Sequence, residues 1–185
     1  MSYKRLQKEL KETFDLNIWT AFVKFVEQKI YKLIAPQEFT LPEYNFSKLI
    51  AKLKPENVWI IYVGLLPEIS NLPLTKNEAK IVESFRTISL NFDADDYEVY
   101  KTFKNIPIES AIMYSAKNPK LVEKYFTSLD SIELRINGND IQNLGIAPSE
   151  KYQECFDYIL KEKIKSPTMK LEDEISLARD FFGIN

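Results

Sequence analysis

Residues 135–152 read RINGNDIQNLGIAPSEKY and hold two of the four glycines of a 185-residue chain. The segments on either side have the apolar spacing of helices, so this stretch decides how the C-terminal part of the chain folds. Gly138 can adopt a positive φ and end one helix, and Asn139 or Asp140 can cap a short second one. Gly145 can end that helix and turn the chain toward Pro148 and a third. The stretch therefore predicts a folded helical corner rather than a linker.

The rest of the chain predicts an all-α fold of about nine or ten short helices. Apolar residues recur with a period of about 3.6 in most segments, and prolines separate the segments. The expected helices outside the corner cover about residues 3–14, 16–34, 46–53, 58–66, 75–90, 95–104, 108–117, 119–135, 149–164 and the segment from Thr168 to Phe182. Residues 58–66 are apolar on all sides and could form a buried strand or a buried helix. A helix is favoured because no second strand-like segment exists to pair with them.

Composition excludes several classes of protein. No apolar run approaches the roughly 20 residues of a membrane span, and the charged N-terminus does not resemble a secretory signal. The chain has no histidine, which removes histidine-based catalytic triads and metal sites. The single cysteine, Cys155, allows no intramolecular disulfide, and we expect it to be buried in a cytoplasmic protein.

The charge pattern requires any nucleic-acid binding to be local. The net charge is −2 and the pI is about 5.4, so only one basic face on an otherwise acidic body could attract RNA. The acidic run from Asp93 to Asp96 resembles a magnesium-binding pair. The spacing of Asp95 and Glu98 also fits a helix N-terminal cap, which is the interpretation we adopt. We therefore expect no metal site.

A resemblance to a known family is centred on residues 134–182. The pattern Leu134-x-Ile136-Asn137-Gly138-x-Asp140-Ile141-x-x-Leu144-Gly145-Ile146-x-Pro148, followed by a helix and by the acidic run from Glu172 to Glu174, resembles the C-terminal region of bacterial class II tRNA nucleotidyltransferases and poly(A) polymerases. These are the CCA-adding and A-adding enzymes. Weaker matches lie at Arg5 and Glu9, at residues 59–66 and at residues 74–78.

The resemblance implies a division of the chain and a function. Residues 1–34 would end a neck-like helical segment, residues 35–130 would form a helical body, and residues 131–185 would form a tail. The chain would bind the acceptor stem and adjoining arm of tRNA and position it for 3′-end nucleotide addition by a catalytic head domain that it lacks. It would contain no catalytic residue and be inactive alone. Mg²⁺ and ATP or CTP would bind only the head, so no cofactor is expected in this chain.

The same resemblance suggests which residues serve RNA binding. Asn139, Ser149 and Lys151 would contact phosphates at helix starts, and Arg135, Lys161 and Lys165 would supply positive charge. The structural residues would be Gly138, Asp140, Gly145 and Pro148 in the corner, with Arg5 and Glu9 bracing the neck. The family commonly has further glycines where this chain has residues 149–152, which leaves the tightness of that turn open.

Two alternatives remain open. The first is an all-helical protein-interaction module without any role in RNA binding, which the acidic pI allows. The second is a homodimer formed through the apolar last helix near Phe181 and Phe182. Binding of tRNA that weakens steeply with salt would favour the RNA-binding hypothesis over the protein-interaction module.

Overall fold

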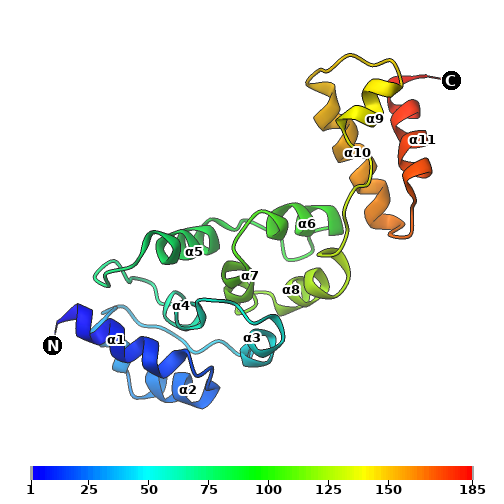
Figure 1. The fold of residues 1–185 in the computed structure, drawn as a ribbon. Coiled ribbons are helices and arrows are strands. Elements are labelled where there is room, and N and C mark those ends of the chain that lie inside the picture. The colour runs from blue at the N-terminus through cyan, green and yellow to red at the C-terminus, as the bar shows by residue number, and fades with distance from the viewer. Residues whose placement is uncertain (1, 185) are drawn as a thin grey trace. The chain divides into compact units, whose positions relative to one another are not determined.

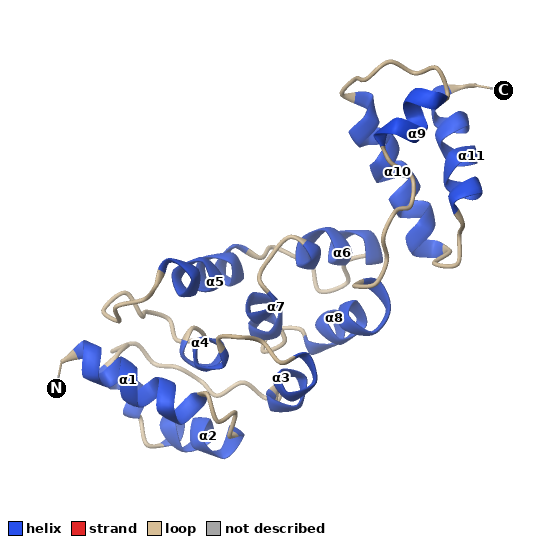
Figure 2. Cartoon of the chain, in the orientation of Figure 1, coloured by secondary structure: helices blue, strands red, loops and turns tan. Residues whose placement is uncertain are grey.

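The computed structural model describes residues 2–184, and every regular element in that range is helical (Figures 1 and 2). The α-helices are α1 (Tyr3–Phe14), α2 (Trp19–Glu27), α3 (Ser47–Leu53), α4 (Val58–Val63), α5 (Lys76–Thr87), α6 (Asp96–Lys104), α7 (Ile108–Tyr114), α8 (Pro119–Lys124), α9 (Gly138–Asn143), α10 (Lys151–Lys165) and α11 (Leu171–Phe182). A 3₁₀ turn, η1 (Ile30–Leu33), follows α2, and a π turn, η2 (Tyr125–Leu129), follows α8. The predicted all-α fold is confirmed.

The chain forms two compact units. The first comprises the residues up to Ala94 together with residues 101–124, and the second comprises residues 95–100 and the chain from Tyr125 onward. Each unit has its own apolar core, so each is described separately below.

The core of the first unit is built around α4. Residues 59–63 of this helix are all buried, and α4 contacts α1, α5 and α7. The Tyr62 ring lies 5.3 Å from the ring of Phe14 and 5.1 Å from the rings of Phe22 and Phe46. The prediction that residues 58–66 are helical is therefore confirmed for Val58–Val63.

Gly64, at the end of α4, permits close packing against α7. A Cβ atom there would lie 2.6 Å from the carbonyl oxygen of Ile60 and 2.7 Å from Cε of Met113 on α7. No side chain fits at that distance, so glycine lets α7 approach the end of α4.

Two predicted helix starts are confirmed by their capping bonds. At α5, the Glu78 amide donates to Thr75 Oγ1 at 3.2 Å and the Thr75 amide donates to Glu78 Oε2 at 2.8 Å. At α6, Asp95 and Glu98 exchange the equivalent bonds at 2.8 and 3.2 Å. Each pair satisfies amides that have no partner within the helix. The cap interpretation of the Asp93–Asp96 run is therefore confirmed.

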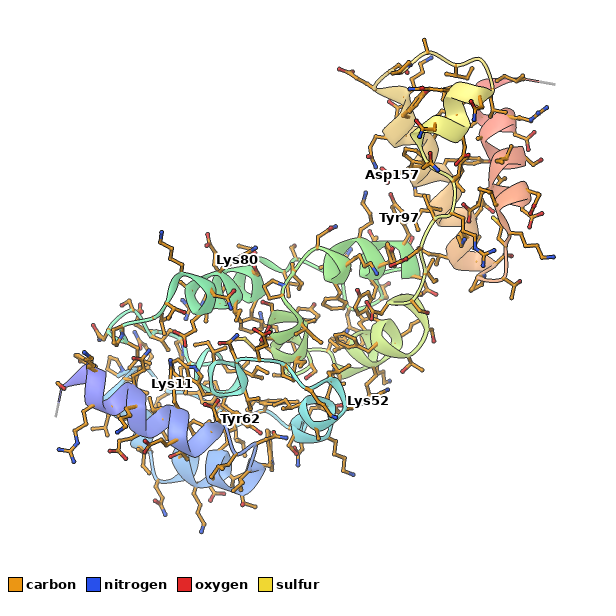
Figure 3. All side chains as sticks on the ribbon, viewed as in Figure 1. Lys11, Lys52, Tyr62, Lys80, Tyr97 and Asp157 are labelled. Carbon is orange, nitrogen blue, oxygen red and sulfur yellow. The ribbon has the colours of Figure 1, made fainter. Side chains whose placement is uncertain are left out.

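Glu78 also connects three helices of the first unit. Its carboxylate is buried and accepts a bond from the Trp59 indole N–H at 3.1 Å. The ammonium group of Lys11 pairs with the same oxygen at 2.8 Å and lies 5.0 Å from the centre of a Trp59 ring. Lys11 on α1 and Tyr62 on α4 are labelled in this unit in Figure 3.

The prediction of one continuous helix over residues 16–34 is wrong. Helix α2 ends at Glu27, and Lys29 adopts a left-handed conformation with a φ of 54° before η1 begins. Leu16, Ile30 and Leu33, which belong to the apolar repeat of this segment, are exposed. Tyr31 accounts for the break, because its ring is buried and its hydroxyl donates to Glu38 and accepts from the Phe39 amide. Burying this side chain outweighs the continuity of the helix.

The predicted helix over residues 119–135 also ends early. Helix α8 stops at Lys124, the π turn closes at Leu129, and no helix is assigned over residues 130–137. The amides of Arg135 and Ile136 donate to the Glu174 carboxylate instead of to helical carbonyls. A partner 38 or 39 residues away therefore sets the path of this segment.

Candidate nucleic-acid interface

The predicted corner begins with helix α9, which is capped by Asn137. The Asn137 side chain accepts from the Asn139 amide at 2.9 Å, and the Asp140 carboxylate accepts from the Asn137 amide at 2.8 Å. Two expectations are corrected here. Gly138 is the first residue of α9, not the positive-φ end of an earlier helix, and the N-cap is Asn137 rather than Asn139 or Asp140.

The second half of the corner follows the sequence prediction more closely. Gly145 has a φ of +85° directly after the cap of α9, a conformation that glycine adopts without strain. The exposed segment that includes Pro148 and Ser149 leads to α10. The Tyr152 hydroxyl donates to the Ile146 carbonyl at 2.7 Å and ties this segment to the start of α10.

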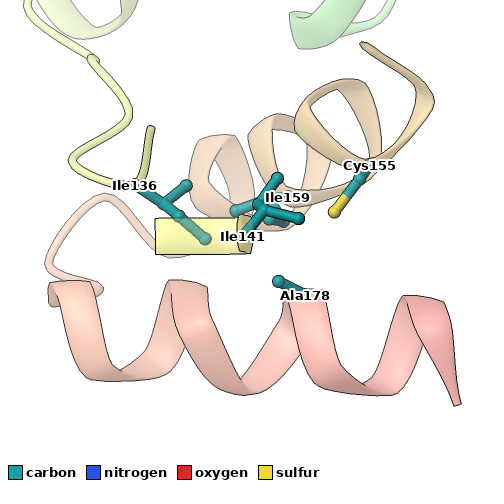
Figure 4. Close-up of a cluster of buried hydrophobic side chains, with 5 residues drawn as sticks. All are labelled: Ile136, Ile141, Cys155, Ile159 and Ala178. Atoms are coloured by element: carbon teal, nitrogen blue, oxygen red, sulfur yellow. The ribbon is translucent and has the colours of Figure 1, made fainter. Parts of the chain in front are cut away.

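A small apolar core supports the corner. Figure 4 shows its five most buried members, which come from the extended segment and from α9, α10 and α11: Ile136, Ile141, Cys155, Ile159 and Ala178. Burial raises the pKa of the Cys155 thiol, which favours the neutral form. Cys155 is therefore a packing residue in this core.

Glu174 is the residue that sequence reasoning missed. Its position in the sequence groups it with the acidic residues at the start of α11, but its side chain is fully buried. One oxygen accepts the amides of Arg135 and Ile136 at 2.7 Å each, and the other pairs with the buried ammonium group of Lys163 on α10. The helical spacing indicates this burial, because Glu174 lies four residues before Ala178 on the apolar face of its helix.

Three predicted RNA-binding lysines lie on one face of α10. Lys151, Lys161 and Lys165 are exposed and fall within an arc of about 80° around the helix. The ammonium group of Lys161 lies 4.7 Å from the centre of the Tyr97 ring. The Lys165 ammonium group pairs with Glu162 at 2.6 Å and stays mostly exposed. Exposed cations on a single helix face are suited to following a line of phosphates.

The other predicted RNA-binding residues are not on this face. Gly138, which precedes Asn139, lies against the ring of Tyr152, a residue on the opposite side of α10 from the three lysines. The Asn139 amide is occupied by the cap of α9, so it is not available to a phosphate. Ser149 is exposed in the loop before α10. The six candidates therefore form separate groups rather than one site.

Arg135 borders a different feature, a polar hollow of about 340 Å³. Its lining residues are Ser128, Ser131, Ile132, Glu133, Leu134, Arg135, Lys163 and Pro167. Because the Lys163 charge is already paired with Glu174, the hollow offers Arg135 and two serine hydroxyls as its available donors.

Arg5 and Glu9 form an exposed pair on α1, with 4.0 Å between Nε and Oε1. Such pairs contribute little to stability. Within residues 2–184, no group of three or more acidic, cysteine or histidine side chains is placed to hold a metal ion. None of the helices in that range is long and apolar enough to cross a bilayer.

Comparison with models of protein families, with curated proteins and with solved structures found no match to this chain.

Proposed function

We propose that this chain is the RNA-holding C-terminal part of a tRNA nucleotidyltransferase or poly(A) polymerase. In this proposal it binds tRNA and positions the 3′ end for a catalytic head domain. The observation that carries the proposal is the gathering of Lys151, Lys161 and Lys165 on one exposed face of α10. That helix lies inside the stretch whose sequence resembles the tail of this family.

The chemistry of an RNA stem suits such a surface. An A-form helix presents phosphates and 2′-hydroxyls to a protein, while its base edges are hard to reach. Positive charge at regular spacing on a rigid helix is therefore sufficient for binding, even on a chain whose net charge is −2. The pair of Lys163 and Glu174 supports α10 as an RNA-binding surface, because this pair joins α10 to α11 and to the corner.

The proposal assigns no catalytic step to this chain. Asp95 of the Asp93–Asp96 run is engaged in capping α6. Nucleotide addition, together with Mg²⁺ and ATP or CTP, is assigned to the head domain. Incorporation of labelled ATP or CTP into tRNA by the purified chain alone would contradict this part of the proposal.

Binding of tRNA at increasing salt concentration tests the proposal. With about three phosphate contacts, the logarithm of the association constant should fall with the logarithm of salt concentration at a slope of about −2 to −3. The substitution Lys161→Glu should weaken binding by roughly tenfold and make the slope shallower by about one. Fluorescence anisotropy with labelled tRNA measures both quantities.

The matched control is Lys80→Glu, which makes the same charge change at an exposed position on α5 in the first unit (Figure 3). It should leave the affinity near that of the wild type. Equal losses in the two variants would indicate a general charge effect and contradict the α10 interface. Absent or salt-insensitive binding of tRNA would contradict the proposed function itself.

One observation favours the alternative of a protein-interaction module. A mainly apolar groove of about 430 Å³ lies among α1, α2 and η1. Its apolar lining includes Leu6, Leu10, Phe25, Ile30 and Leu33. If the chain does not bind tRNA, this groove is the feature on which a protein-binding function would rest.

A further inference from the structure

The exposed face of α10 carries an aromatic residue among its lysines. Residues 151, 154, 158, 161 and 165 follow one another at spacings of three, four, three and four, which places them in a single stripe along the helix. All five are exposed, and they are three lysines, Glu154 and Tyr158. Tyr158 lies at the centre of the stripe, about 10 Å along the helix axis from Lys151 and from Lys165.

Tyr158 packs against a second helix and keeps part of its surface exposed. Its ring centre lies 5.8 Å from that of Phe181 on α11, with an angle of 36° between the ring planes. The residue nevertheless keeps 37% of its surface exposed. A ring supported by a second helix loses little further freedom when a ligand stacks on it, which favours binding.

We propose that Tyr158 is a stacking platform for an unpaired RNA base. The ring stacks on the base, while Lys161, one turn away, and Lys151 and Lys165, two turns away on either side, hold the neighbouring phosphates. Proteins that bind single-stranded nucleic acid combine these two elements, aromatic rings for the bases and a basic track for the backbone.

Charge on this face supports RNA as the ligand. Three lysines outnumber the single glutamate of the stripe, and Lys161 extends over the Tyr97 ring, also within the second unit. Glu162 lies beside the stripe and pairs with Lys165, whose ammonium group stays mostly exposed. A basic or purely apolar partner would gain less from this combination of groups.

The inference rests on the proposed function and makes it more specific. Lysines alone would bind any RNA backbone, whereas a stacking ring distinguishes RNA with an unpaired base from a continuous duplex, whose bases are stacked on each other. The RNA bound here would therefore have a loop or a single-stranded segment against α10.

Two probes of equal charge test the inference with the full chain. One is an RNA hairpin with an unpaired loop, and the other is a blunt duplex with the same number of phosphates. Substituting Tyr158→Leu keeps an apolar side chain over Phe181 but removes the aromatic ring. It should weaken hairpin binding by roughly tenfold and leave duplex binding nearly unchanged. Tyr158→Phe should bind both probes as the wild type does.

The control variant is Tyr3→Leu, which makes the same change at another exposed tyrosine, in the first unit. It should bind both probes normally. Thermal melting by circular dichroism establishes that each variant is folded. If the leucine variant melts early, Tyr158→Met replaces it, because methionine also lacks the ring and keeps a long apolar side chain over Phe181.

The possible results separate the two proposals. If wild-type protein binds RNA but Tyr158→Leu binds the hairpin normally, or loses affinity for both probes equally, the stacking inference is overturned while the proposed function stands. The same holds if Tyr158→Phe loses as much affinity as the leucine variant. If the wild type binds neither probe nor tRNA, both proposals fail.

Discussion

Glu174 is a charged residue on the apolar face of α11, and its environment explains why it is tolerated there. Burying a carboxylate is costly unless its oxygens are fully bonded. Two backbone amides and the Lys163 ammonium group meet this requirement. The same bonds fix the extended segment before α9, so one side chain joins three parts of the second unit.

Replacing Glu174 by glutamine should destabilise the second unit. The amide oxygen of Glu174→Gln can still accept the two backbone bonds, but Lys163 becomes an unpaired buried charge, at a cost of about 3 kcal/mol. Urea denaturation followed by circular dichroism measures this loss. The control Glu172→Gln, at an exposed position on the same helix, should change stability by less than about 0.5 kcal/mol.

A double variant tests the physical cause. Adding Lys163→Met to Glu174→Gln removes the unpaired charge and should recover part of the lost stability. A double variant less stable than the single one would show that the ion pair is not the source of the effect.

At the scale of whole elements, the helices with local start signals were predictable from sequence. Helices α5 and α6 begin at capping boxes formed by residues three apart, and such signals do not depend on the rest of the fold. Helix ends were less predictable. The break at Lys29 comes directly before the buried Tyr31, and the extended path of Arg135 and Ile136 depends on Glu174, a partner that only tertiary packing brings close.

In the candidate interface, too, some features follow from local sequence and others from tertiary packing. The spacing of Lys151, Lys161 and Lys165 places them on one face of any regular helix, so their grouping follows directly from sequence. The positions of Arg135 and Asn139 depend on how the corner packs against α10, which spacing along the chain does not encode. The spacing of Tyr158 places it on the same face, but the contact of its ring with Phe181 depends on how α11 packs, which spacing along the chain does not encode.

The contacts of Glu78 at the start of α5 predict how the first unit responds to acid. Burial alone favours the protonated form of Glu78, but bonds from Lys11, Thr75 and Trp59 outweigh it and hold the pKa of this carboxyl below its ordinary range. The folded pKa is therefore lower than the unfolded value of about 4.3. The stabilisation is fully present above that value and is lost as the pH falls through the folded pKa.

Glu78→Gln should therefore cost about 1–3 kcal/mol near neutral pH and progressively less as the pH falls to about 3. Urea denaturation monitored by tryptophan fluorescence measures the difference from wild type at each pH. The control Glu83→Gln, exposed on the same helix, should show almost no difference at any pH. A difference for Glu78→Gln that is constant down to pH 3 would contradict this account.

At the scale of the molecule, the two units have separate cores, and the two tryptophans belong to only one of them. Trp19 and Trp59 lie in the first unit, so tryptophan fluorescence reports its unfolding. Circular dichroism reports the helices of both units. Because each unit has its own buried cluster, we expect them to unfold with different midpoints.

The Glu174 and Glu78 variants together test this independence. Glu174→Gln should lower the free energy of unfolding of the second unit, measured by circular dichroism. It should leave the free energy of unfolding measured by tryptophan fluorescence within about 0.5 kcal/mol of the wild-type value. Glu78→Gln should do the reverse, because changes at sites that share no partners act separately. A single transition that both variants shift equally, by either method, would mean that the chain unfolds as one cooperative body. In that case, RNA bound to α10 would stabilise both units. If the units instead unfold with separate midpoints, RNA bound to α10 would stabilise only the second unit.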